Sequence, residues 1–265
     1  MKDVLQNLES LDIPGLMDAS QIAYATFRSS FPGAALHDEP GLLWFETGVP
    51  LKIFNGVLRT QLEVDALPAT IERMVTHFRR RQLPFEWNVG PTSQPYDFDD
   101  LLRPYALSRA EDEIGMAMDL HMLNENMPPI PNLVIQEVTT DEQLRQWSQT
   151  WGRGAPPEAS THWYTLYSGL KLTAASPVHL YLGMLDGEPV ATAALFFELG
   201  VAAIHHIMTA HKVRRMGIGA AITLHMAQEA RRLGFRIAIL TATLLGINIY
   251  RRLGFREYCP FKTYE

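Results

Sequence analysis

Short apolar runs separated by turn residues follow one another through the second half of the chain, and they predict strands. Each run is rich in aliphatic, β-branched or aromatic residues, as strands are. Asp186-Gly187 lies between two of the runs and predicts a two-residue hairpin. Strands are therefore expected at residues 132–138, 179–185, 188–198, 201–209, 235–242 and 255–264.

Helical periodicity fills the spaces between these strands. One helix is predicted to begin near Asp141, where Thr140 or Asp141 can cap the first turn. Another is expected over 219–233, because apolar residues recur on one face and Gly234 follows them. Shorter helices are expected at 162–172 and 244–253. This order predicts an α/β fold, a mixed sheet with helices on its faces.

The first half of the chain repeats the order more weakly after a helical start. Three prolines at positions 128, 129 and 131 cannot continue a helix, so "NMPPIPN" is the best internal boundary. We expect two domains, residues 1–130 and 131–265, as two copies of one fold. In the first half, strands are expected at 41–47, 51–58 and 85–90, helices at 69–81 and 97–107, and a further apolar segment at 114–123.

Composition narrows the class of protein. A formal net charge of −6 argues against a general nucleic-acid binder. The single cysteine, Cys259, excludes an internal disulfide, and no Cys/His spacing suggests a metal site. The first residues lack the apolar segment of a signal peptide, and no apolar run reaches membrane-spanning length. We therefore expect a cytoplasmic protein with no nucleic-acid partner, no membrane partner and no metal.

Candidate chemistry begins in "HKVRRMGIGAA", residues 211–221, between a predicted strand and a predicted helix. Arg214, Gly217 and Gly219 form the pattern R-x-x-G-x-G. A glycine turn at a helix N-terminus exposes backbone N–H groups to an anion, and Lys212 and Arg215 add positive charge. The pattern is neither a Walker loop nor a dinucleotide-binding fingerprint. By itself it is also compatible with a tight turn carrying solvated arginines.

A second motif, "IYRRLGF" at 249–255, follows about thirty residues later. In this order and spacing the two motifs make residues 132–265 resemble the GCN5-related N-acetyltransferase (GNAT) family. The resemblance implies that the glycine motif binds the pyrophosphate of coenzyme A. The first half lacks both motifs, and "LPFEWNVGPTSQPYDFDDLLRPYAL" resembles the degenerate N-terminal copy of tandem family members. The implied architecture is two GNAT-like folds in tandem, each with a twisted mixed sheet flanked by helices.

The resemblance also implies acetyl-CoA as co-substrate and assigns residues to it. The strand 201–209 would hold the pantetheine arm like an added strand, with a backbone N–H of Ile207 or Met208 polarising the acetyl carbonyl. Thr243 stands where many relatives have Asn or Ser. The implied cofactor-binding residues are Ile207, Met208, Thr209, Arg214, Arg215, Met216, Gly217, Ile218, Gly219, Ala220, Thr243 and Tyr250.

Two side chains are candidates for proton transfer. Tyr250 matches the family tyrosine that protonates the leaving thiolate; the alternative is a tyrosine packed on the sheet. His205 is the candidate for deprotonating the amine, directly or through water, and the alternative is a histidine packed under a helix. His206 is expected on the opposite face, in a packing role. The carboxylates that relatives use are missing, since Ala203 stands at one position and the apolar run 237–242 covers the other.

Several side chains are candidates for the site that binds the acceptor amine. Glu198 is a nearby carboxylate but is expected as a solvated hairpin residue, and Trp87 is expected in the core rather than in a cleft. An aromatic-lined acceptor site is one possibility, with core packing as the default. The aromatic residues concerned are Trp147, Trp151, His162, Trp163, Tyr164 and Tyr167.

The leading hypothesis is an N-acetyltransferase acting directly on an amine of a small molecule or a peptide, as a monomer or homodimer. Two alternatives stay open at this point: a non-catalytic acyl-CoA sensor, and a protein that binds nucleotide phosphate without coenzyme A.

Overall fold

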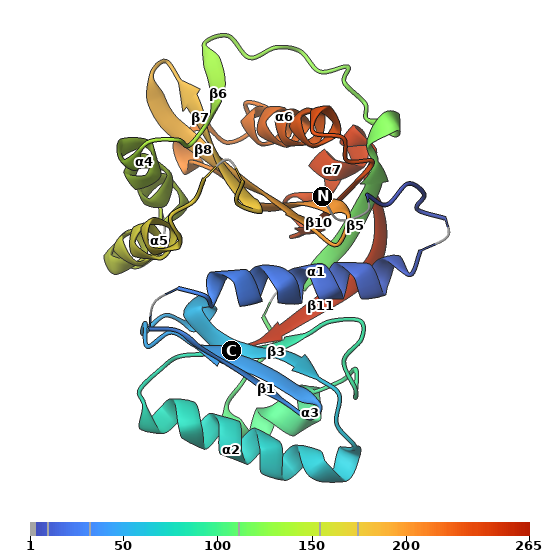
Figure 1. The fold of residues 1–265 in the computed structure, drawn as a ribbon, viewed down its shortest axis with the longest axis vertical. Helices are drawn as coiled ribbons and strands as arrows, with labels where there is room; N and C mark the ends of the chain where they lie inside the picture. The colour runs from blue at the N-terminus through green and yellow to red at the C-terminus, as the bar shows by residue number, and fades with distance from the viewer. Residues whose placement is uncertain (1–3, 10, 32, 111, 154, 174) are drawn as a thin grey trace. The chain divides into compact units, whose positions relative to one another are not determined.

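The computed structural model describes residues 4–9, 11–31, 33–110, 112–153, 155–173 and 175–265 (Figure 1). The chain forms two compact units. One, here called the C-terminal unit, comprises Met1–Ile13 and Gly115–Tyr258; the other, the N-terminal unit, comprises Pro14–Ile114 and Cys259–Glu265. Among the described residues, no helix is both long enough and apolar enough to span a bilayer.

The C-terminal unit is built on a mixed sheet whose strands follow the order β5-β10-β9-β8-β7-β6. Strand β10 is parallel to β9, whereas β6, β7, β8 and β9 are antiparallel to their neighbours. Its elements are β5 (Glu113–Asp119), η4 (Leu120–Met122), β6 (Leu133–Glu137), α4 (Asp141–Trp151), α5 (Pro157–Leu170), β7 (Val178–Leu185), β8 (Glu188–Glu198), β9 (Val201–Thr209), η5 (His211–Val213), α6 (Ile218–Arg232), β10 (Ile237–Ala242), α7 (Ile247–Leu253) and the start of β11 (Arg256–Tyr264).

The N-terminal unit has a smaller mixed sheet in the order β1-β2-β3-β4-β11. Strands β3 and β4 are parallel and are joined through α2, whose apolar face is fully buried in the core of this unit. Its elements are α1 (Ile13–Arg28), β1 (Ala35–Glu39), β2 (Leu42–Glu46), η1 (Lys52–Phe54), β3 (Asn55–Thr60), η2 (Val64–Ala66), α2 (Leu67–Arg80), β4 (Glu86–Val89), α3 (Asp99–Leu102), η3 (Arg103–Tyr105) and the end of β11.

Each unit takes a strand from the other half of the sequence. Strand β5 comes from the first half but neighbours β10 in the C-terminal unit. Conversely, the last residues of the chain belong to the N-terminal unit, where Lys262 pairs with Val89 and Tyr264 with Trp87. The compact units are therefore not two continuous stretches of sequence. The domains 1–130 and 131–265, as copies of one fold, stay a prediction.

The sequence predicted most elements of the C-terminal unit within a few residues. Strands β8 and β9 have the expected bounds, and Asp186 and Gly187 have the left-handed backbone of the expected hairpin, with φ of 50° and 81°. Helix α4 begins with the capping box of Thr140 and Gln143. Helix α5, by contrast, begins at Pro157, earlier than the expected start at 162, because proline is favoured in a first helical turn.

The first half departs further from expectation. Residues 51–58 were predicted as one strand, but they begin as the 3-10 helix η1. The Asn55 side chain explains the turn, because its amide donates hydrogen bonds to the carbonyls of Val49 and Leu51. Strand β1 was not expected, and the helix expected at 97–107 is only the short α3 followed by η3. Trp87 is fully buried in the core, as expected.

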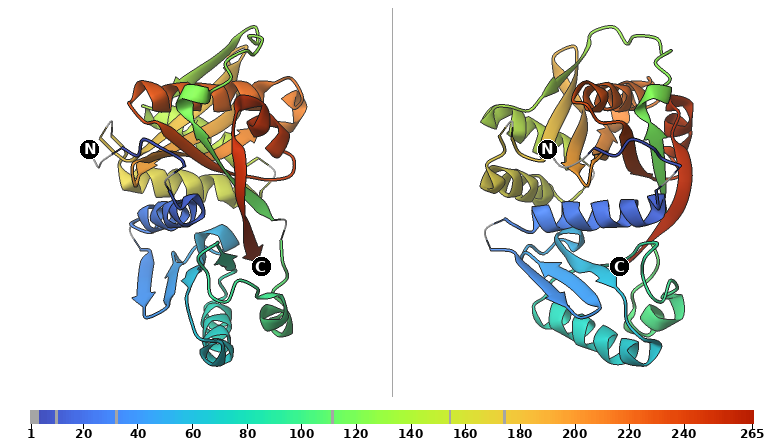
Figure 2. Two further views of the ribbon diagram at one scale, coloured as in Figure 1. Left: turned by 90° about the vertical axis from the view of Figure 1, so that its right-hand side faces the viewer. Right: turned by 45° about the vertical axis from the view of Figure 1, so that its right-hand side comes forward.

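Helices cover both faces of the sheet in the C-terminal unit (Figures 1 and 2). Tyr181 of β7 contacts His225 of α6, with ring centroids 6.0 Å apart, so α6 lies on the face of Tyr181. Ala193 is paired with Tyr181 and shares that face, whereas Phe196, three residues further along β8, faces the other way. Its ring contacts His205, and the neighbouring His206 packs against Trp147 of α4. Helices α4 and α5 therefore cover the second face.

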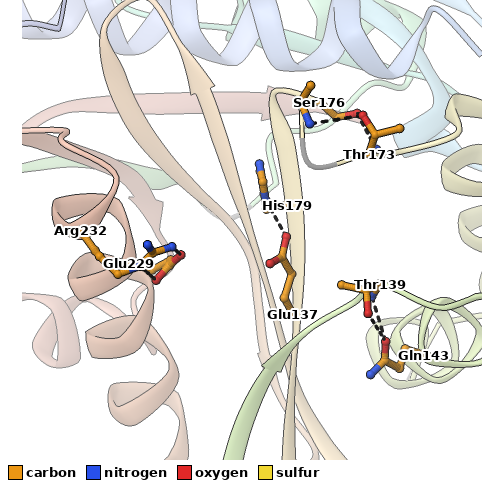
Figure 3. Close-up of polar contacts among 9 residues, drawn as sticks. Glu137, Thr139, Gln143, Thr173, Ser176, His179, Glu229 and Arg232 are labelled. Atoms are coloured by element: carbon orange, nitrogen blue, oxygen red, sulfur yellow. Dashed lines mark hydrogen bonds and ion pairs between the residues drawn. The ribbon is translucent and has the colours of Figure 1, made fainter. Parts of the chain in front are cut away.

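Polar contacts fix the surface of this scaffold (Figure 3). His179 of β7 and Glu137 of β6 lie 2.6 Å apart across the edge of the sheet. In the last turn of α6, Arg232 hydrogen-bonds Glu229 and thereby lowers the pKa of that carboxyl. The first contact joins β6 to β7 and the second lies within α6, and neither involves the predicted site residues.

Candidate functional site

The site begins where β9 separates from its parallel neighbour β10. The two strands pair at Ala202, Ala203 and Ile204, and within the described residues the pairing ends with Ile204 and Leu240. Strand β9 nevertheless continues to Thr209. Its first four residues are buried and its last five are half-buried, so the change in burial coincides with the end of pairing. Beyond Ile204, β9 therefore continues without pairing to β10.

A β-bulge lies at the same point of β9. Thr192 of β8 pairs with Met208, but Ala194 pairs with His205, so two residues of β9 oppose one of β8. One of the two is His206, whose φ of 53° is in the left-handed region. A bulge turns local backbone groups away from the regular ladder. Beyond the bulge, the β9 backbone is therefore not paired with β10, and the bulge changes its orientation relative to β8.

The predicted anion loop forms the N-terminus of α6. Gly217 is the N-cap residue with φ of 86°, a conformation that favours glycine, and its helix end has no side-chain cap. No acidic residue stands in the first turn. Arg214 and Arg215 are exposed beside it, and the guanidinium of Arg214 donates to the carbonyl of Thr209 at 3.3 Å. Uncapped N–H groups and adjacent positive charge give this end the properties of an anion site.

Strand β9, the glycine loop and α7 converge at Gly219. A Cβ placed on Gly219 would lie 3.4 Å from Oγ1 of Thr209 and 3.7 Å from Cδ1 of Ile249. Ile249 is followed by Tyr250, whose ring is buried against Gly246; a Cβ there would meet that ring at 2.8 Å. The two sequence motifs are therefore brought together with the end of β9, as the predicted site requires.

The remaining predicted binding residues surround this junction. Ile207, Met208 and Thr209 are half-buried on the free part of β9. Thr243 is exposed just after β10. In the loop and helix start, Met216 is exposed, whereas Ile218 and Ala220 are buried and support the helix.

The two histidines lie on the same side of the sheet, contrary to expectation. Their ring centroids are 6.3 Å apart, which is too close for neighbours on opposite faces of a regular strand. The bulge explains the error, since the left-handed φ of His206 breaks the alternation of side chains. His206 enters a cluster of aromatic rings from α4 and α5, and no sequence pattern beyond the paired histidines indicates this cluster.

The aromatic acceptor candidates mostly belong to the core. Trp147, Trp163 and Tyr167 are buried, and the phenol of Tyr164 donates to Asp141 at the surface. His162 and Trp151 are half-buried. Of these side chains, Trp151 combines partial exposure with a ring contact to His206, at 4.5 Å. Glu198 is half-buried at the hairpin end of β8.

The corresponding part of the N-terminal unit is closed by its own chain. Parallel strands β3 and β4 also pair only briefly, at Gly56–Glu86 and Val57–Trp87. Beyond that, the carbonyl of Val57 accepts from the Asn88 side chain, at 3.1 Å. The backbone of Gln94 then donates to the Thr60 carbonyl at 2.8 Å and accepts from the Leu62 N–H at 3.2 Å. The strand edge that is open in β9 is therefore occupied in β3.

The helix that follows β3 is also unsuited to phosphate. Pro68 stands in the first turn of α2 and provides no N–H donor. Glu63 and Asp65 lie just before the helix, where their carboxylates would repel an anion. Among the described residues of both units, no three His, Cys, Asp or Glu side chains form a cluster that could hold a metal ion.

Comparisons with known proteins agree with this geometry. The family described as "Acetyltransferase (GNAT) family" matches residues 137–255. A GCN5-related N-acetyltransferase from Kribbella flavida has a similar structure, with a TM-score of 0.68 at 19% identity, covering 93% of this chain and 94% of that one. A tandem GNAT protein from the clavulanic acid biosynthesis pathway gives 0.60 at 14% identity, covering 99% and 96%. A GCN5-related N-acetyltransferase from Sphaerobacter thermophilus gives 0.57 at 14% identity, covering 85% and 76%.

At these identities the solved structures establish the fold alone. No curated protein matches the sequence. The predicted α/β fold and the predicted family are confirmed. Residues 137–255 match the acetyltransferase (GNAT) family, and the fold of the chain is similar to that of solved GNAT proteins.

Proposed function

We propose that the protein is an acetyl-CoA-dependent N-acetyltransferase that transfers the acetyl group directly to an amine of a small molecule or peptide. The observation that carries the proposal is the unpaired end of β9 beyond Ile204, whose last residue, Thr209, meets Ile249 of α7 at Gly219 beside the uncapped N-terminus of α6. An extended amide-bearing ligand can pair with a strand edge, and a pyrophosphate can bind a helix N-terminus.

The residues present fit acetyl-CoA. The space beside Gly219 would be narrowed by any side chain, because a Cβ there would already contact Thr209. The segment from Arg214 to Ala220 would hold the pyrophosphate, and Ile207, Met208 and Thr209 would hold the pantetheine through their backbone. The bulge would direct a backbone N–H of Ile207 or Met208 towards the acetyl carbonyl, where it would stabilise the charge that develops on oxygen.

Two side chains would move protons. A neutral amine nitrogen attacks the carbonyl carbon, the carbon–sulfur bond breaks, and the sulfur leaves as thiolate. Tyr250 would donate its phenolic proton to that thiolate. His205 would accept the proton that the amine must lose, directly or through water, because a lysine-like amine with pKa ~10.4 is almost fully protonated at neutral pH.

The proposal is tested by acetyl-CoA binding and by thiol release. Acetyl-CoA should raise the melting temperature, ATP should not, and free CoA should appear when a suitable amine is supplied from a panel of alkyl amines, aromatic amines and peptide N-termini. Binding without thiol release on any amine would instead indicate an acyl-CoA sensor. Stabilisation by ATP but not by CoA would overturn both assignments.

A further inference from the structure

An aromatic cluster encloses the His206 side chain on the α4–α5 face of the sheet. Three tryptophan rings meet the imidazole edge to face, and the Tyr167 ring lies slightly further away. The four rings, here called the aromatic cage, are Trp151 at 4.5 Å, Trp163 at 5.0 Å, Trp147 at 5.6 Å and Tyr167 at 6.5 Å between centroids. Except for Trp151, these rings are almost completely buried, so the cage is rigid.

Specific polar contacts hold the same residue at both its ring and its backbone. The Tyr167 hydroxyl lies 3.2 Å from Nε2 of His206. On the backbone, the Thr192 hydroxyl donates to the His206 carbonyl at 2.8 Å. In turn, the Trp147 indole N–H donates to the carbonyl of Ala193, the β8 residue opposite the bulge. The bulge is therefore fixed from α4, α5 and β8 together.

His206 has an uncommon backbone conformation for a side chain of its size. A non-glycine residue at φ of 53° is disfavoured, and such residues persist where their surroundings determine the conformation. Here the surroundings are the aromatic cage and the two hydroxyl groups. Because the bulge lies directly beyond the last β9–β10 pair, its conformation sets the direction of the backbone N–H groups that follow.

We propose that His206 is a positioning residue: clamped by Tyr167 and the aromatic cage, it holds the β9 bulge so that the backbone beyond it points into the gap between β9 and β10. This inference rests on the proposed acetyl transfer, whose carbonyl the bulge would polarise. It assigns to His206 a part in catalysis distinct from proton transfer at His205. A donor that acts on the transition state lowers kcat when it is displaced, with little effect on ground-state binding.

The closing experiment removes one hydroxyl group. Tyr167→Phe keeps the aromatic ring but loses the contact to His206. We expect kcat to fall about tenfold, with KM for acetyl-CoA unchanged within a factor of two. Tyr164→Phe is the matched control. It removes a phenol hydroxyl from the same helix, but that hydroxyl contacts Asp141 and Arg145 instead of His206. Equal kcat for the two variants would overturn the proposal.

Substitution of His206 itself separates clamping from simple stability. Asparagine and glycine both tolerate the left-handed region, but only asparagine keeps a polar side chain inside the aromatic cage. We therefore expect His206→Asn to retain most of the wild-type kcat and His206→Gly to lose most of it. In both cases kcat is calculated per mole of folded protein, which is measured by acetyl-CoA binding. A fall in melting temperature for both variants with kcat unchanged would contradict positioning.

A readout without turnover distinguishes this proposal from the proposed function. Tyr167→Phe should accelerate hydrogen exchange at the amides of residues 206–208 several-fold, while amides of α6 exchange as in the wild type. If the wild type releases no thiol, acetyl transfer fails; if exchange at 206–208 is unchanged in Tyr167→Phe, the clamp fails.

Discussion

Ile204 of β9 and Leu240 of β10 are the last residues to pair the two strands within the described part of the chain. The bulge, the glycine loop and α7 all lie at the end of the sheet that this separation opens. A strand edge freed at one point, next to an uncapped helix N-terminus, is what an extended ligand with a terminal anion requires.

Gly217→Ala should weaken acetyl-CoA binding about tenfold and lower the melting temperature by about 2–4 °C. Alanine is strained at the φ of 86° that Gly217 adopts, so the loop would shift and its N–H groups would lose their alignment. Gly234→Ala is the control, since that glycine has a similar φ of 91° at the other end of α6. Calorimetric titration with acetyl-CoA should show unchanged affinity for the control.

Tyr250→Phe should lower kcat at least a hundredfold with little loss of acetyl-CoA affinity, because only the thiolate-protonating group is removed. The ring would keep its packing against Gly246. Single-turnover thiol release checks the rate and equilibrium titration checks the binding. Tyr258→Phe, on an exposed ring of β11, is the matched control. Full turnover in Tyr250→Phe would remove the acid role.

His205→Gln should lower kcat/KM for the amine most strongly near neutral pH. If His205 accepts the amine proton, its loss matters less as the pH rises towards the pKa of the amine, ~10.4 for a lysine-like group, because the amine then loses the proton unaided. The pH profile of kcat/KM for wild type and variant measures this difference. A constant ratio across the pH range would assign His205 to packing.

The sequence predicted the parts of the site that depend on local chemistry. The bounds of β8 and β9 follow from apolar runs that end at turn residues, and the glycine loop follows from its motif. The bulge could not be predicted, because an apolar pattern carries no information on φ. The prediction that His206 lies on the opposite face from His205 was therefore wrong. The place of the last strand in the N-terminal unit could not be predicted either, because the pairing between β11 and β4 joins residues far apart in sequence.

The protein should bind one acetyl-CoA per chain. In the N-terminal unit, Gln94 already occupies the backbone hydrogen bonds of Thr60 and Leu62, and Pro68 removes a donor from the start of α2. Isothermal titration of the wild type should therefore give a stoichiometry of one. Gly217→Val adds a branched side chain at the strained loop and should abolish acetyl-CoA binding. Residual binding in that variant would reveal a second site.

Glu86→Gln should stabilise the protein above about pH 6. Burial raises the pKa of Glu86 to about 6, although Lys52 and Arg28 favour its charged form. Because the folded pKa lies above the unfolded value of 4.5, the folded state binds more protons between these values, and wild-type stability falls as the pH rises through them.

Glutamine carries no charge to desolvate, so the variant should be more stable than the wild type by about 1–2 kcal/mol at pH 7 and nearly equal to it at pH 4.5. Urea unfolding at a series of pH values measures the difference. Glu72→Gln, at an exposed position of α2, should show no such pH-dependent gain. A Glu86→Gln variant that is less stable than the wild type at pH 7 would mean that the attraction of Lys52 and Arg28 outweighs the burial of the carboxylate.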